Sequence, residues 1–213
     1  RRGSAEKVLS LRRANEIRAP EIEVKWHGAI PVVSLVQFGQ TTANLFVDVA
    51  EDVAKQSPDV FVLDLRGNPG GLLNAANVLL SAFMGPDKVF LRLKQRGTMN
   101  ELKTTYEQKI GDAVHIYVLV DEYSAAGAEI VATILQEYGR ATVAGRQTGG
   151  YTTIQEVSVF TNGDMLKITV AEWLTTKGLS LHQKGVQPDI LLSSDDPQEQ
   201  MQQILGIIRS LPK

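Results

Sequence analysis

The sequence predicts an α/β protein, and three observations carry this prediction. Hydrophobic residues make up 43% of the 213 residues and charged residues 22%, which is typical of a globular chain. Two runs, VFVLDL at 60–65 and VHIYVLV at 114–120, are apolar along nearly their whole length, as expected of strands covered on both faces. A helical pattern over 42–56 separates the strand candidate at 30–38 from the first run. This order of strand, helix and strand implies a βαβ unit in a parallel sheet.

The elements of the first half follow from local patterns. A short alternating run predicts a strand, and a polar stretch containing Pro20 predicts a linker after it. Helical spacing of apolar residues predicts two helices, the first ended by Pro58. A dense turn signal, RGNPGG, follows the buried strand. In chain order, we expect strands at 8–13, 30–38 and 60–65, helices at 42–56 and 72–84, and a turn at 66–71.

The second half continues the alternation and then departs from it. A short strand is followed by a polar stretch that predicts a surface excursion, and the next helix ends at the capping residue Gly139. Asn162-Gly163 between two β-rich runs indicates a hairpin, so we expect an antiparallel extension at 154–174. The predicted strands are 89–93, 114–120, 141–144, 157–160 and 165–170, the loops 94–112 and 145–153, and the helices 127–138 and 197–208.

Composition excludes several classes of function. The chain has 22 Lys and Arg against 24 Asp and Glu, so it lacks the basic excess expected of a nucleic-acid-binding protein. No apolar run reaches the roughly 18 residues that span a bilayer, and no signal peptide is expected at residues 1–4. Cysteine is absent, which excludes disulfides and thiol nucleophiles. His27, His115 and His182 are too far apart for a local metal motif; we interpret His115, in a buried strand pattern, and His182 as structural.

Three short segments are candidates for chemistry. The turn at 66–71 has adjacent glycines whose backbone N–H groups could face a substrate, with an ordinary tight turn as the alternative. The segment DEYSAAGAE at 121–129 leads into a helix N-terminus, which stabilises negative charge. Its Ser124 is a candidate nucleophile or, alternatively, a helix N-cap. The Gly/Thr loop at 145–155 lacks the ending of a P-loop, so nucleotide binding is not expected.

Together these segments resemble the C-terminal processing peptidases, also called tail-specific proteases. VLSLRR at 8–13 resembles the last strand of that family's PDZ domain, and the rest of that domain is not in this sequence. The resemblance implies a PDZ remnant and linker at 1–19, a peptidase core at 20–192 and a C-terminal amphipathic helix at 193–213. Four segments carry it, in family order: VFVLDLRGNPGGLLNAA at 60–76, VLVDEYSAAGAEIVATILQEYGRATVAG at 118–145, TGG at 148–150 and DMLKITVAEWLTTKGLSLHQKGVQPDI at 164–190.

This resemblance implies a fold related to the crotonase and Clp protease cores, and a Ser–Lys dyad that cleaves unstructured protein C-termini. The lysine is a neutral general base, which requires a pKa lowered by burial. By motif, the oxyanion-hole donors are the N–H groups of Gly71 and Gly127, and Gln155 is the glutamine that positions the base. The family acts outside the cytoplasm, in the periplasm, cell envelope or thylakoid lumen, so the resemblance implies export. No metal or other cofactor is implied, and a homo-oligomer stays open.

Both members of the dyad are replaced in this sequence. The position of the reactive serine holds Ala126, and the position of the lysine holds Tyr151. We therefore expect a serine peptidase core that keeps the peptide groove but is inactive or severely impaired.

One explanation is a natural pseudoprotease that binds peptides or serves as a scaffold. Another is an engineered serine-to-alanine change, made to trap substrate, in an enzyme with a different base, such as His27 or a histidine outside this chain. The third is a shifted site that uses Ser124, with Tyr151 as its hydrogen-bonding partner. The LRGNPGG and KGVQPDI pieces argue against an acyl-CoA enzyme on the related crotonase core.

Overall fold

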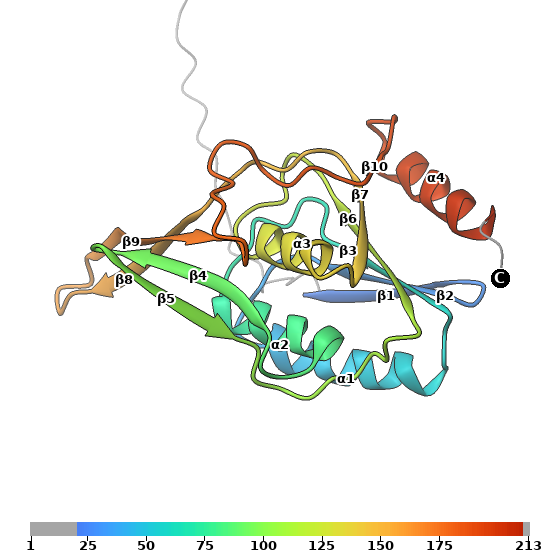
Figure 1. Cartoon of the computed structure of the whole chain (residues 1–213), viewed down its shortest axis with the longest axis horizontal. Helices are drawn as coiled ribbons and strands as arrows, with labels where there is room; N and C mark the ends of the chain where they lie inside the picture. The colour runs from blue at the N-terminus through green and yellow to red at the C-terminus, as the bar shows by residue number, and fades with distance from the viewer. Residues whose placement is uncertain (1–20, 211–213) are drawn as a thin grey trace, which may run out of the picture.

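The computed structural model describes residues 21–210, which form two sheets and four helices (Figure 1). The expected strand at 8–13 and the expected PDZ remnant lie outside these residues. In chain order the elements are β1 (Ile22–His27), β2 (Ile30–Leu35), α1 (Thr42–Lys55), β3 (Val60–Asp64), α2 (Leu73–Met84), β4 (Val89–Gln95), β5 (Thr98–Lys103), β6 (His115–Val120), α3 (Gly127–Glu137), β7 (Ala141–Gly145), β8 (Thr153–Val159), β9 (Met165–Leu174), β10 (Ile190–Leu191) and α4 (Pro197–Ser210).

The larger sheet has the strand order β1-β2-β3-β6-β7-β10. Strands β2, β3, β6, β7 and β10 are parallel to one another, and β1 pairs antiparallel with β2. The unit β2-α1-β3 is the βαβ unit that the sequence predicts, and the α/β class is confirmed. Because β3 and β6 are adjacent and parallel, the loops that follow them meet at one edge of the sheet.

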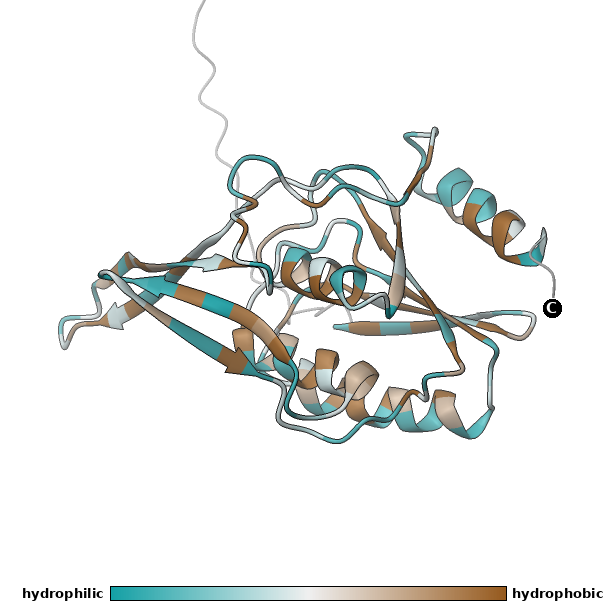
Figure 2. Ribbon diagram, in the orientation of Figure 1, coloured by the Kyte–Doolittle hydropathy of each residue, from teal (hydrophilic) through white to brown (hydrophobic). Residues whose placement is uncertain are grey.

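Successive residues of the central strands face opposite sides of the sheet, and helices cover both sides. Phe61 and Leu63 of β3 belong to the core cluster beneath α1, α2 and α3, whereas Val62 belongs to a second cluster with Ile204 and Ile208 of α4. Figure 2 shows how hydrophobic the central strands and α2 are along their length. The predicted amphipathic C-terminal helix is therefore present, and it packs on the sheet of its own domain.

The smaller sheet is antiparallel, with the order β5-β4-β9-β8. Its presence corrects the expected surface excursion at 94–112, since β5 pairs with β4 across a turn at Arg96 and Gly97. These two residues have φ values of 45° and 84°, as a two-residue hairpin turn with positive φ requires. The sequence TMNELK of β5 is almost entirely exposed, so it lacks the hydrophobic alternation that marks a half-buried strand.

Three further boundaries differ from the sequence prediction. Strand β1 falls in the region expected to be linker or loop, although Ile22, Val24 and Trp26 alternate with polar residues. Strand β10 has only two residues, too few for a pattern. The predicted hairpin at 154–174 is confirmed and its strands are longer than expected; it turns at Asn162-Gly163, and Phe160 N–H donates to the Asp164 carbonyl (2.8 Å). Strand β8 is the open edge of this sheet and begins where the Gly/Thr loop ends.

Candidate active site

The glycine turn after β3 and the segment after β6 are held together by Asn68. This side chain is fully buried. Its amide nitrogen donates to the Leu35 carbonyl (2.7 Å), and its amide oxygen accepts from Gly70 N–H (2.8 Å). The Asn68 carbonyl in turn accepts from Ala125 N–H (2.9 Å). One asparagine thus fixes the turn of the first motif against the helix entry of the second.

Two adjacent glycines allow the turn to approach that helix entry closely. Gly70 has φ 88°, and a Cβ on it would lie 2.6 Å from the Gly127 nitrogen and 2.7 Å from the Ala125 carbonyl oxygen. Gly71 has φ 142°, and a Cβ there would collide with the Phe38 carbonyl. Within residues 21–210, neither the N–H of Gly71 nor that of Gly127 donates to an acceptor. Both groups therefore remain available for a ligand.

This close approach makes a prediction about stability. We expect Gly70→Ala to lower the free energy of unfolding by about 2–6 kcal/mol, because it adds backbone strain to overpacking, each worth roughly 1–3 kcal/mol. Gly67→Ala is the matched control, since Gly67 has φ 68° but no atom within 4 Å of an added Cβ. It should cost only about 1 kcal/mol. Urea unfolding of both variants measures the difference; equal costs would contradict the packing described.

Ala126 stands at the N-cap of α3 in an unusual backbone conformation, with φ 46° and ψ −106°. A non-glycine residue with positive φ in such a region costs about 1–3 kcal/mol and occurs preferentially at functional sites. A sharp strand-to-helix turn also presents the nucleophile in α/β-hydrolases. The turn therefore has a geometry that suits a nucleophile. Ala126 itself carries only a methyl group and has no reactive atom.

Glu129 joins this turn to the Gly/Thr loop, and the sequence analysis missed it. Its carboxylate is fully buried. One oxygen accepts from the N–H groups of Ala126 (3.0 Å) and Tyr151 (2.8 Å). The other accepts from Gly150 N–H (2.6 Å) and the Thr148 hydroxyl (2.5 Å). The capping-box pattern that would mark this glutamate needs Ser or Thr at the N-cap, and the N-cap here is Ala126, so the sequence alone did not reveal it.

The backbone at residue 151 is fixed on both sides. Besides the bond to Glu129, the Tyr151 carbonyl accepts from the indole N–H of Trp173 (3.2 Å). The Tyr151 side chain is 61% exposed, and its ring lies against Gly149. Because these contacts hold the backbone of residue 151, a different side chain there would project from the same Cα position.

A pocket of about 680 Å³ lies between the glycine turn, the start of α3 and the β8–β9 hairpin. It brings together five of the residues that the sequence analysis selects: Gly71, Ala126, Gly127, Tyr151 and Gln155. The remaining lining residues are mostly apolar, namely Pro69, Leu72, Leu73, Ala125, Ile130, Thr153, Ile154, Lys167 and Trp173. Five positions from three segments that are distant in sequence therefore share one cavity.

Ser124 does not line this pocket. It is fully buried, and its hydroxyl donates to the Leu65 carbonyl (2.8 Å) and accepts from Asp121 N–H (2.9 Å). It is also not the N-cap of α3, because that position is Ala126. These contacts give Ser124 a part in holding the turn after β6, and they leave its hydroxyl no path to the pocket.

The histidines also lie away from the pocket. His27 pairs with Ile30 at the start of β2, level with the beginning of β3, whereas the pocket lies beyond the other end of β3. This position argues against His27 as a base. The His182 ring nitrogen Nδ1 is 3.3 Å from the Thr152 hydroxyl, outside the pocket lining. His115 opens β6 and is exposed, which corrects the expectation of a buried site.

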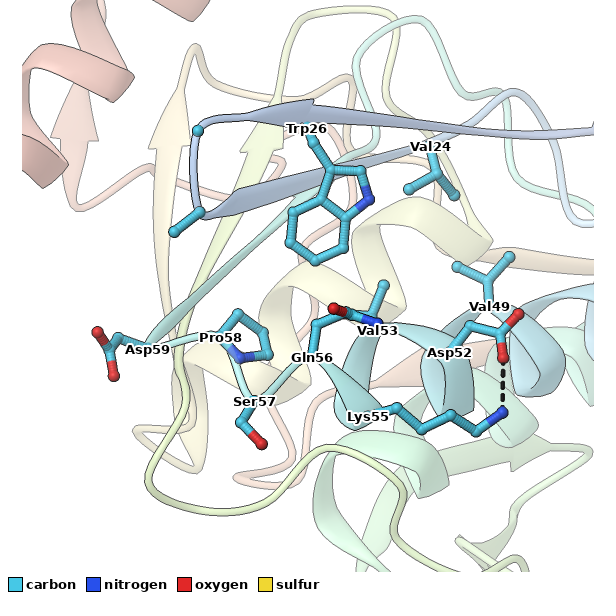
Figure 3. A pocket seen from close by; sticks show the side chains of 12 residues that line it. Val24, Trp26, Val49, Asp52, Val53, Lys55, Gln56, Ser57, Pro58 and Asp59 are labelled. Atoms are coloured by element: carbon cyan, nitrogen blue, oxygen red, sulfur yellow. Dashed lines mark hydrogen bonds and ion pairs between the residues drawn. The ribbon is translucent and has the colours of Figure 1, made fainter.

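A second hollow of about 760 Å³ lies between the β1–β2 hairpin and the end of α1 (Figure 3). Trp26 and Val53 face each other across it, and the Lys55 ammonium is paired with the Asp52 carboxylate (2.7 Å). None of the motif residues lines this hollow. Because the sequence motifs converge on the first pocket instead, we place the candidate site there.

Residues 21–210 contain neither a cluster of metal-binding side chains nor a membrane-spanning helix. No cluster of three or more His, Cys, Asp or Glu side chains in this range could hold a metal ion. No helix in the same range has the length and apolar character to cross a bilayer.

The sequence is similar to one protein family and to named members of it. Residues 29–192 match the model of Peptidase family S41. A probable CtpA-like serine protease of Staphylococcus aureus (strain COL) is 31% identical over 194 residues, covering 91% of this chain and 39% of the relative. One of Staphylococcus epidermidis is 30% identical over 195 residues, covering 91% and 40%. The chain thus spans about two-fifths of the length of these relatives.

Solved structures share the fold. The photosystem II D1 C-terminal processing protease matches with a TM-score of 0.74 at 23% identity, over 83% of this chain and 49% of that one. A lipoprotein from Streptococcus agalactiae matches with a TM-score of 0.74 at 16% identity, over 90% and 70%. A putative S41 protease from Bacteroides fragilis has a TM-score of 0.73 at 18% identity, over 90% and 58%.

Proposed function

The chain belongs to peptidase family S41, and from that premise we propose that it is the core of a CtpA-like serine peptidase that binds unstructured protein C-termini. The observation that carries this proposal is the shared pocket, in which the nucleophile position, two free backbone N–H groups and the base position lie together. As it stands, the chain binds peptide without rapid hydrolysis, because Ala126 has no nucleophilic atom.

In this proposal the two free N–H groups form the oxyanion hole. Gly71 lies in the turn after β3, and Gly127 is the first residue of α3, where the helix dipole favours negative charge. Fixed backbone donors stabilise an anionic tetrahedral intermediate more than the neutral carbonyl that precedes it. The Gly71 and Gly127 donors survive the loss of the serine, so the groove keeps part of its affinity for a peptide carbonyl.

The base position supports the prediction of impaired catalysis. Tyr151 stands where the family resemblance places lysine, and its phenol offers no amine to act as that base. Gln155 keeps the place of the positioning glutamine on β8. No histidine lines the pocket within the described part of the chain. We therefore favour a core that has lost both members of the dyad over one that relies on a different base.

The pocket suits an extended peptide. Strand β8 is the open edge of the smaller sheet, and Thr153, Ile154 and Gln155 line the pocket at its start. An extended peptide can add to such an edge through main-chain hydrogen bonds while its side chains enter neighbouring pockets. This mode needs little sequence specificity, as recognition of unstructured C-termini requires.

Peptide binding tests the proposal directly. We expect a fluorescent unstructured peptide to bind the full chain, and Leu72→Lys to weaken binding about 10-fold, because Leu72 lines the pocket with 48% of its surface exposed. Leu179→Lys is the matched control: Leu179 is 58% exposed and lies outside the pocket lining. Absence of binding, or equal weakening by both variants, would contradict the proposal.

Location outside the cytoplasm is part of the same proposal. It is supported by the CtpA-like relatives and by the fold shared with the Streptococcus agalactiae lipoprotein. We also propose the division expected from the sequence, with a peptidase core at 20–192, flanked by a PDZ remnant at 1–19 and a C-terminal helix at 193–213.

A further inference from the structure

Among residues 21–210, Lys167 is the only charged residue that lines the candidate active-site pocket. The other thirteen lining residues include no aspartate, glutamate, arginine or histidine. Within residues 21–210, the Lys167 ammonium group forms no ion pair, whereas Lys25, Lys55 and Lys109 each pair with a carboxylate. An unpaired cation at the wall of a pocket attracts an anion that the chain itself does not supply.

The register of the hairpin explains how Lys167 comes to face the pocket. Val157 pairs with Lys167, and Gln155 pairs with Thr169. Side chains two residues apart share a face of a sheet, so Lys167 lies diagonally across from Gln155, about 7–8 Å away. Glu156 pairs with Ile168, on the opposite face, and is therefore not placed to neutralise Lys167.

The rest of the pocket narrows the chemistry of the ligand. Leu72, Leu73 and Ile154 give it an apolar wall, and Ile130 and Trp173 are buried behind them. A ligand with an apolar group next to a single negative charge can pack against the apolar wall and pair with the Lys167 ammonium group at the same time. The last residue of a peptide has this form, because its side chain and its terminal carboxylate are neighbours.

We propose that Lys167 binds a carboxylate of the peptide and so selects chain ends or acidic residues for this pocket. This inference rests on the proposed peptide-binding function and adds the residue that recognises the carboxylate. An ammonium-to-carboxylate hydrogen bond is roughly twice as strong as a neutral one and becomes stronger when water is excluded from the pocket. The contact between Lys167 and the carboxylate affects peptide binding and therefore does not depend on the residue at position 126.

The test compares one short unstructured peptide in three forms, all binding the full chain. The first has a free C-terminal carboxylate, the second a C-terminal amide, and the third a C-terminal amide with an acidic last residue. We expect the free acid to bind about 10-fold more tightly than the amide, and Lys167→Met to remove this difference. Lys103→Met is the matched control, since Lys103 is an exposed lysine of the same sheet outside this pocket.

Each outcome has a defined meaning. If the third peptide binds as tightly as the first and depends on Lys167, an acidic side chain serves as well as a chain end; if it binds like the plain amide, the chain end is the ligand. Both results support the inference. If free acid and amide bind equally, or if Lys167→Met weakens both to the same extent, the inference is overturned while the peptide-binding function stands. If no peptide binds, the proposed function fails, and this inference with it.

Discussion

The double variant Ala126→Ser/Tyr151→Lys is expected to cleave an unstructured peptide at least about 10³-fold faster than the unmodified chain. The reason is that the remaining parts of the site are already in place. Gly71 and Gly127 offer free N–H groups, and Gln155 lines the same pocket. Glu129 and Trp173 hold the backbone of residue 151, so the side chain of a lysine there would extend into the pocket from a fixed Cα.

The single variants separate the two defects. Ala126→Ser alone should remain slower than the double variant by about 10²–10⁴-fold, which is the contribution of a general base. Tyr151→Lys alone should show no gain, because no nucleophile is present. Full activity of Ala126→Ser alone would show that another group supplies the base, and would favour a simple serine-to-alanine change over a core that has lost its dyad. Initial rates on one fluorogenic peptide measure all four proteins.

Replacing Glu129 is expected to have a large effect on stability. Glu129→Ala leaves four donors without their acceptor in a buried site: the N–H groups of Ala126, Gly150 and Tyr151 and the Thr148 hydroxyl. We expect a loss of about 3–5 kcal/mol in the free energy of unfolding, a large share of the stability of an ordinary domain. Chemical unfolding followed by circular dichroism measures this loss.

A milder change distinguishes a local role in the site from a general structural one. Glu129→Gln keeps the size of the side chain but cannot accept from all of its donors, so residues 126 and 151 should shift relative to each other and peptide binding should weaken by about 10-fold. Glu137→Ala is the control on the same helix, since Glu137 accepts from the N–H and hydroxyl of Thr176 away from the pocket. It should lower stability and leave peptide affinity unchanged. Equal peptide affinity for Glu129→Gln and the unmodified chain would contradict the role assigned to Glu129.

The sequence predicts the elements that are buried or strongly patterned. Strands β3 and β6 are continuous apolar runs because helices cover both faces of the sheet, and such runs are visible without a structure. Strand β5 is almost entirely exposed and therefore polar, and β10 is too short for a pattern, so neither could be recognised. Strand β1 did carry an alternating pattern, and the polar residues within it led to the incorrect expectation of a linker or loop.

The candidate site divides in the same way. Its glycine turn, its helix entry and position 151 were found from the sequence because they lie in compact motifs that resemble a known family. Glu129 required the structure, because its role depends on four donors from two loops, one about 20 residues further along the chain. Lys167 is one of many exposed lysines in the sequence, and only the register of β8 and β9 connects it with the pocket.

Our main proposal is that Ala126 occupies the nucleophile position of a peptidase pocket. Labelling with a fluorophosphonate probe, followed by mass spectrometry, tests it most directly, because the probe reacts with an activated serine hydroxyl. We expect an adduct at position 126 in Ala126→Ser/Tyr151→Lys, suppressed by excess peptide, and no adduct on the unmodified chain, where the hydroxyl of Ser124 is buried. An adduct on Ser124 of the unmodified chain, or a folded double variant that takes no label, would contradict it.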